Sequence, residues 1–154
     1  MEYLIGFFDG AAQRNTCGCG FWISISNKLA YKTHWYGGSG TNTKAEAMAL
    51  WGLLCFTNFL GIPAIHIYGD SKIIIDQIMG RANINNPLLL GWLGRIGLLW
   101  NQLNNSTIMH IGREQNKEVD EILKRGLLGN FGNMHMEIIL NQNVLDVRDF
   151  PFPG

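Results

Sequence analysis

The amino-acid sequence predicts an α/β fold, in which one five-stranded mixed sheet is flanked by helices. Three short segments with strand-like patterns follow one another near the N-terminus, which is typical of an antiparallel meander. Two further short apolar segments then alternate with helical patterns, which is typical of parallel strands joined by crossover helices. Hydrophobic residues make up 47% of the 154 residues, enough for a sizeable core in one domain.

The first three strands are expected within the first 36 residues. Leu4 to Phe8 is a continuous apolar run that ends at Asp9-Gly10, as a buried strand does. A loop containing glycine and asparagine is expected from Ala11 to Cys19. The second and third strands follow at residues 20–25 and 29–36, joined by a tight turn at 27–28.

Helical spacing of apolar residues predicts a helix from Asn42 to Leu60, with Thr41 or Asn42 as its N-cap. A helix that begins at Pro87 contains three glycines at three-residue spacing, so either a neighbour packs very closely there or the helix is weak. Trp92 and Trp100 of this helix are expected in the core. The remaining elements are a strand at 64–68, helices at 71–79 and 87–103, a strand at 107–111 and a helix at 114–128.

Beyond Gly129 the chain is expected to be irregular. We therefore divide it into a domain of residues 1–128 and a C-terminal tail of residues 129–154. The tail is expected either to pack on the domain or to bind a protein partner.

Composition and charge narrow the classes of function that the sequence can have. Twelve basic and twelve acidic residues give a net charge of zero, which argues against a nucleic-acid binder. No apolar run approaches the roughly 20 residues that cross a bilayer, so no membrane span is expected. An odd count of three cysteines favours an intracellular, reducing compartment, without distinguishing nucleus, cytoplasm and organelle. Cys17 and Cys19 lack a second ligand pair, so buried thiols are favoured over a zinc site.

Four acidic residues lie at unusual places. Glu46 and Asp120 fall on apolar helix faces, where an unpartnered carboxylate is costly. Asp9 and Asp70 follow predicted strands, although a turn and a helix N-cap are respectable alternative explanations for them. Carboxylates held close together repel unless cations neutralise them, and Mg²⁺ prefers oxygen ligands. The four acids therefore predict a divalent metal site.

At these residues the chain resembles the ribonuclease H family, in particular the compact domains of plant retrotransposon-related proteins. The resemblance covers roughly residues 4–128 and four motifs in order. They are Phe8-Asp9-Gly10-Ala11, Thr41-Asn42-Thr43-Lys44-Ala45-Glu46, Tyr68-Gly69-Asp70-Ser71, and the stretch from His110 to Asp120 that includes Asn116.

The resemblance implies a ribonuclease H-like fold and an endonuclease that hydrolyses the RNA strand of RNA–DNA hybrids. It implies that Asp9, Glu46, Asp70 and Asp120 hold two Mg²⁺ ions, for which Mn²⁺ can substitute, and that His110 aids product release or shuttles a proton. It places the hybrid against a set of small polar and backbone groups: Gly10, Ala11, Asn15, Asn42 and Asn116. The other histidines, His34, His66 and His135, are expected to be structural or solvated.

Two other functions stay open. One is a catalytically weak or inactive module, derived from a retroelement, that binds nucleic acid or serves as a scaffold, since a fold does not guarantee an activity. The other is a related metal nuclease, such as an exonuclease or an integrase-like enzyme. All four acids are present, which favours the active endonuclease over the first, and the ending His110–Asn116–Asp120 favours ribonuclease H over the second.

Overall fold

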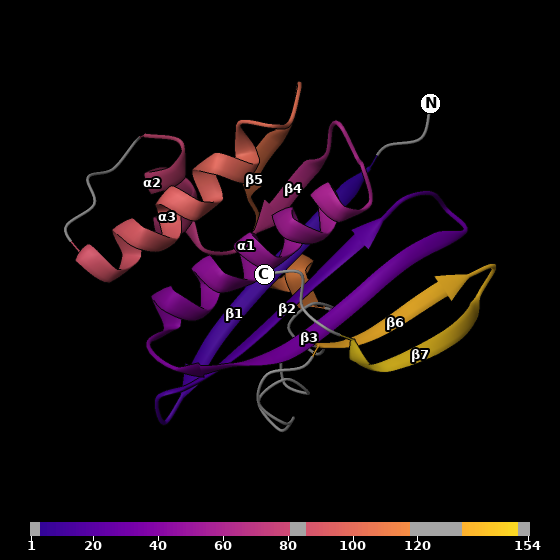
Figure 1. Ribbon diagram of the computed structural model, residues 1–154, viewed down its shortest axis with the longest axis horizontal. Helices are drawn as coiled ribbons and strands as arrows, with labels where there is room; N and C mark the ends of the chain where they lie inside the picture. Colours follow the sequence, from indigo (N-terminus) through magenta and orange to yellow (C-terminus); the bar gives the residue numbers. More distant parts are fainter. Residues whose placement is uncertain (1–3, 81–85, 118–133, 151–154) are drawn as a thin grey trace.

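The computed structural model describes residues 4–80, 86–117 and 134–150 (Figure 1). Its elements in chain order are β1 (Ile5–Gln13), β2 (Thr16–Ser24), β3 (Leu29–Ser39), α1 (Asn42–Phe59), β4 (His66–Gly69), α2 (Lys72–Ile78), α3 (Pro87–Trp100), β5 (Thr107–His110), a 3₁₀ turn (Arg113–Asn116), β6 (Met134–Leu140) and β7 (Asn143–Phe150).

The strands form one mixed sheet in the order β5-β4-β1-β2-β3-β6-β7. The meander β1-β2-β3 is antiparallel, whereas β4 and β5 run parallel to β1. The predicted α/β fold class is confirmed, with seven strands in the described residues where five were expected. Within these residues, no helix is long and apolar enough to span a membrane.

The hairpin between β1 and β2 corrects the sequence analysis. The predicted loop from Ala11 to Cys19 is wrong, because β1 continues to Gln13 and β2 begins at Thr16. Arg14 and Asn15 alone make the turn, with φ of 52° and 64°. Two left-handed central residues match the right-handed twist of the paired strands. Asp9 consequently lies inside a strand, opposite Gly20, and not at the end of one.

A second hairpin replaces the irregular tail expected beyond residue 129. β6 pairs with β3, and β7 pairs with β6, so the sheet gains two antiparallel strands (Figure 1). Asn141 and Gln142 form the turn, with φ of 51° and 70°. Met136 of β6 is buried in the core. A protein partner for the C-terminal segment stays a prediction.

Helix α1 packs across one face of the sheet (Figure 1). The Thr41 side chain caps it by accepting a hydrogen bond from the Lys44 amide at 3.2 Å, as predicted. Two thiols of β2 support the same end of the helix. Cys17 Sγ lies 3.7 Å from the Thr41 carbonyl oxygen and Cys19 Sγ 3.5 Å from that of Ala45. Both thiols are fully buried, as expected, and burial raises the pKa of each.

Helix α3 lies beside α1. Its three glycines, at 91, 94 and 97, have no atom of a neighbouring element within 4 Å of an added Cβ, so close packing does not explain them. Trp92 contacts Trp51 of α1 edge to face, with ring centroids 5.6 Å apart. Trp92 and Trp100 both pack against the core, as predicted. Of the helix predicted at 114–128, residues 118–128 lie outside the described part of the chain.

Candidate functional site

Three neighbouring parallel strands bring predicted site residues to one edge of the sheet. Phe8 of β1 lies opposite Gly69 of β4, so the next residues, Asp9 and Asp70, are adjacent across the strands. Gly69 in turn lies opposite His110 of β5. Ligands bind at this carboxyl edge in many α/β sheets. The exposed ring of His110 is thus at the same edge as the two aspartates.

Gly10 allows α1 to lie directly on β1 beside Asp9. A Cβ at Gly10 would lie 2.2 Å from the carbonyl carbon and oxygen of Ala45 and 2.5 Å from the Glu46 amide nitrogen. These atoms are backbone, so no side-chain rotation could make room. The contact fixes Glu46, one residue further along α1, next to the strand that carries Asp9.

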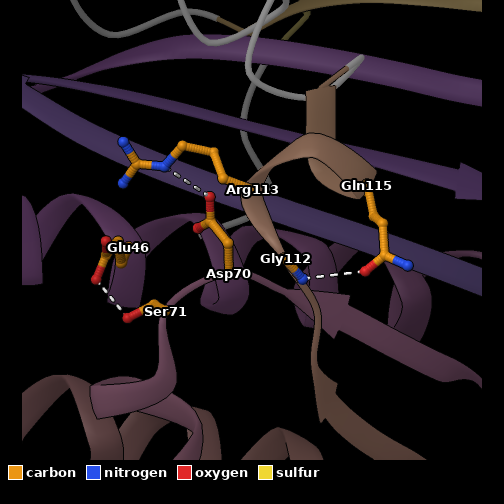
Figure 2. Close-up of polar contacts among 6 residues, drawn as sticks. All are labelled: Glu46, Asp70, Ser71, Gly112, Arg113 and Gln115. Atoms are coloured by element: carbon orange, nitrogen blue, oxygen red, sulfur yellow. Dashed lines mark hydrogen bonds and ion pairs between the residues drawn. The ribbon is translucent and has the colours of Figure 1, made fainter.

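Ser71 links Glu46 to the Asp70 loop. Its hydroxyl donates to Glu46 Oε2 at 2.5 Å and accepts from the Ile74 amide at 3.4 Å, so the same side chain caps α2 (Figure 2). The N-cap role that was an alternative explanation for Asp70 therefore belongs to Ser71. Ser71 belongs to one of the four motifs, but no role for it is predicted from the sequence. Its position between an acid and a helix was the available signal.

Asp70 faces an arginine from the segment after β5. Arg113 Nε lies 3.6 Å from Asp70 Oδ2 (Figure 2). The Asp70 side chain is 8% exposed and that of Arg113 is 86% exposed. An ion pair with one exposed partner is weak, because solvent screens it. Arg113 is therefore a replaceable counter-charge for a buried carboxylate.

The electrostatics of Glu46 show the cost of grouping acids. Burial raises the pKa of Glu46, and the negative charge of Asp70 raises it further. The hydrogen bond from Ser71 and the charge of Arg113 act in the opposite direction without cancelling the rise. A cation beside Glu46 and Asp70 would relieve both effects.

The carboxylates fit a hard divalent cation by chemistry, because all their donors are oxygens. The side chains that could bind the cation are less completely grouped than their chemistry suggests. Within residues 4–80, 86–117 and 134–150, no three His, Cys, Asp or Glu side chains form a group that could hold a metal ion. Asp120, the fourth predicted ligand, lies outside the described residues. A metal site at Asp9, Glu46, Asp70 and Asp120 accordingly stays a prediction.

Four of the five predicted nucleic-acid contacts gather near the start of α1. Asn42 Oδ1 accepts a hydrogen bond from the Ala12 amide at 2.7 Å, and the Asn15 carbonyl accepts one from Gly40 at 2.9 Å. Asn15 and Asn42 are exposed, Ala11 is half-buried and Gly10 is buried. Asn116 belongs to the 3₁₀ turn after β5, where Gln115 Oε1 accepts from the Gly112 amide at 3.0 Å (Figure 2).

Comparison with protein families gives one match across most of the chain. A family described as reverse transcriptase-like matches residues 7–126. The uncharacterized protein YpeP of Bacillus subtilis (strain 168) is 28% identical over 143 residues. That alignment covers 88% of this chain and 63% of the relative, so the chain spans less than two thirds of the relative's length.

Several solved structures that share this fold are ribonucleases H. RNase H1 of the halophilic archaeon Halobacterium salinarum aligns with a TM-score of 0.76 and 25% identity, covering 81% of this chain and 97% of the other. LC11-RNase H1, solved in complex with an RNA/DNA hybrid, gives 0.69 and 26%, covering 80% and 96%. The N-terminal RNase H domain of a Mycobacterium tuberculosis protein gives 0.74 at 22% identity, covering 82% and 94%, and supports the fold alone.

Proposed function

The chain belongs to the reverse transcriptase-like family and has the ribonuclease H fold, and we propose that it hydrolyses the RNA strand of RNA–DNA hybrids. One observation carries the proposal. Asp9 of β1 and Asp70, which follows β4, lie next to each other across two parallel strands, and Ser71 ties Glu46 of α1 to the Asp70 loop.

In the proposed reaction, Asp9, Glu46, Asp70 and Asp120 hold two Mg²⁺ ions, or Mn²⁺ in their place. Such a pair, when bound, activates the attacking water and stabilises the leaving 3′ oxygen. Ser71 holds the Glu46 carboxylate beside the Asp70 loop through its hydrogen bond. Arg113, largely exposed beside Asp70, is placed to exchange that contact for a phosphate. His110, at the same edge, is proposed to assist departure of the product.

The substrate proposal rests on the grouped polar residues around the start of α1. Exposed amides of Asn15 and Asn42, with the backbone at Gly10 and Ala11, are proposed to contact the hybrid, together with Asn116. Small polar and backbone groups of this kind can bind the 2′-hydroxyl that distinguishes RNA from DNA. Because the chain has no net charge, binding is expected to be weaker than for a basic relative. Contacts of cationic side chains with phosphates should make that binding strongly salt-dependent.

A second candidate is a hybrid-binding module with little or no cleavage, derived from a retroelement. The contacts of Asp70 with Arg113 and of Glu46 with Ser71 favour it, since both acids have protein partners already. Cleavage and binding distinguish the two candidates, so both are measured in the same experiment.

The test uses a labelled RNA–DNA hybrid with Mg²⁺ or Mn²⁺, the wild type and the variant Asp70→Asn. A metal ligand contributes several kcal/mol to the transition state and each 1.36 kcal/mol is tenfold, so the variant should lose at least about 100-fold in rate. Asp76→Asn, the same change inside α2, is the matched control and should cleave like the wild type. Fluorescence anisotropy with the same hybrid measures binding.

Each outcome points to one conclusion. No cleavage by the wild type with either ion, but specific binding of the hybrid, contradicts the enzyme and supports the binding module. Equal cleavage by the wild type and Asp70→Asn contradicts the metal site while keeping the activity.

We further propose an intracellular, reducing compartment, which the free thiols of Cys17, Cys19 and Cys55 support.

A further inference from the structure

The register of the sheet places a row of residues across four strands. Asp9 of β1 lies opposite Gly20 of β2, Gly20 lies opposite His34 of β3, and His34 lies opposite His135 of β6. Directly opposite residues point to the same face of a sheet, and successive residues alternate. Gly10 contacts α1, so Asp9 and the whole row lie on the face opposite α1.

The C-terminal end of this row is a hydrogen-bonded chain. His135 Nδ1 lies 3.1 Å from His34 Nε2, and the two rings meet edge to face with centroids 4.5 Å apart. The other nitrogen of His135, Nε2, contacts the carboxylate of Asp146 from β7. From the sequence alone, both histidines are expected to be structural or solvated, with no link between them. The β6–β7 hairpin, which lies beside β3 in Figure 1, joins them.

The chain restricts where protons reside. Asp146 accepts from His135 Nε2, so that nitrogen carries a hydrogen, and a neutral His135 can then accept from His34 Nε2. When His135 Nδ1 instead donates to His34 Nε2, His34 Nδ1 carries the hydrogen and can donate to a further acceptor.

Asp9 is the acidic residue of the same row. Asp9 is 5% exposed and His34 is 8% exposed. Gly20, which lies between them in the row, has no side chain, and β1 and β3 are two strand spacings apart, roughly 9.5 Å. Two side chains that lean toward each other over a glycine can span this distance. A buried carboxylate is costly unless it is hydrogen-bonded, which favours such a contact.

We propose that His34 is a positioning residue for the Asp9 carboxylate, and that its ring is held by His135 and Asp146. The C-terminal hairpin, which is separated from β1 by β2 and β3, would then support the Asp9 side chain through His34. The inference rests on the proposed function only in that Asp9 takes part in cleavage. The orientation of Asp9 is a property of the metal-free protein and can be measured without any reaction.

The experiment compares His34→Leu, which keeps apolar bulk without a donor, with His34→Gln, which keeps an N–H donor. Asp146→Asn weakens the chain at its far end. Glu137→Gln removes the same charge from the same hairpin and is the matched control. In metal-free protein at one fixed pH, NMR follows the carboxyl carbon of Asp9 and the ring nitrogens of the two histidines.

His34→Leu should shift the Asp9 carboxyl resonance, and His34→Gln should return it toward the wild-type value. Asp146→Asn should shift the ring nitrogens of both histidines and move Asp9 less. In hybrid cleavage, His34→Leu should lose about 10–100-fold in kcat with KM changed less than about twofold, as for other residues that orient a metal ligand. Glu137→Gln should match the wild type in both measurements.

An unchanged Asp9 resonance in folded His34→Leu overturns the proposal. Equal losses in His34→Leu, His34→Gln and Glu137→Gln also overturn it, because they indicate only a structural role. If His34→Leu fails to fold, Asp146→Asn and His34→Gln carry the test through the ring nitrogens and Asp9. If Asp9 shifts as expected while the wild type does not cleave hybrid, the positioning role stands and the proposed function fails.

Discussion

Helices α1 and α3 lie side by side, but the chain holds them very differently. Ten of the 18 residues of α1 are buried, against two of the 14 in α3. An added Cβ at Gly10 would collide with the backbone of α1, whereas one at any of the three glycines of α3 would meet no neighbouring element. Leu88 and Leu98 of α3 are 79% and 71% exposed.

The difference follows what each helix carries. Glu46 lies in α1, and its carboxylate is useful only if it stays beside Asp70 and the strand of Asp9. Tight packing of α1 against β1 and β2 provides that fixed position. Helix α3 carries none of the predicted metal ligands, so it can be loosely packed without disturbing them. Substitutions that test this contrast should change the free energy of unfolding by different amounts in the two helices. For one type of substitution the change should even have opposite signs.

The largest effect is expected from truncating a buried leucine of α1. Leu53 is fully buried and packs over Gly6 of β1, so Leu53→Ala should lower the free energy of unfolding by about 2–5 kcal/mol. Leu98→Ala in α3 should change it by no more than about 0.5 kcal/mol, because the side chain is mostly in solvent. Urea unfolding measures both, and similar losses would remove the contrast.

Adding a methyl group at the contact between β1 and α1 is expected to have the next largest effect. Gly10→Ala places a Cβ against the backbone of Ala45 and Glu46, so a strand or a helix must move. We expect a loss of about 1–3 kcal/mol in stability, with a further loss of hybrid cleavage because Glu46 is displaced. A variant as stable as the wild type would show that the contact is not tight.

The same substitution in α3 should have the opposite sign. Gly94 is exposed and helical, and no neighbouring element lies within 4 Å of an added Cβ. Gly94→Ala should therefore raise the free energy of unfolding by about 0.5–1 kcal/mol through helix propensity alone. Thermal unfolding by circular dichroism measures the gain. A loss of stability would mean that α3 needs the glycine for packing in solution.

The smallest effect concerns the carboxylate that α1 holds in place. The pKa of Glu46 is raised above its ordinary value of 4.5, mainly by burial. A raised pKa in the folded state means that stability is full below the unfolded pKa and is lost as pH rises through the folded value. Glu46→Gln should therefore stabilise the metal-free protein near neutral pH, by about 0.5 kcal/mol.

Thermal unfolding in a chelator at several pH values provides the check. The gap between Glu46→Gln and the wild type should close below about pH 4, where the carboxyl is protonated in both states. A gap that is constant with pH would contradict the linkage to ionisation. Loss of hybrid cleavage in the same variant would show that α1 keeps a destabilising group for its chemistry.

Sequence patterns located α1 well because the helix is long and begins after a recognisable N-cap residue. Its residues 42–59 and the Thr41 cap match the expected helix and one of its two suggested caps. Motif order also led to Asp9, Glu46 and Asp70, which the fold brings to one region. The close approach of Gly10 and the pairing of Ser71 with Glu46 depend on how α1 and α2 lie in space, and local patterns do not contain that information.

Both hairpins were missed for one physical reason. Two-residue hairpin turns usually contain Asn-Gly or Asp-Gly, because both central residues adopt left-handed backbone conformations. Here the turns are Arg14-Asn15 and Asn141-Gln142, with four non-glycine residues at positive φ. The glycines of 10–20 lie in the strands instead, where they suggested a loop. Without a glycine to mark the second turn, the alternating residues of β6 and β7 looked irregular.

The pairing of β6 with β3 has a practical consequence for handling the protein. β3 is eleven residues long and is covered along its outer side by β6 over six paired positions. A shortened chain that ends before Met134 would leave those backbone groups open, and an open strand of this length is a template for pairing with other molecules. Such a fragment should therefore aggregate. Expression of the domain in soluble form is expected to require the full hairpin.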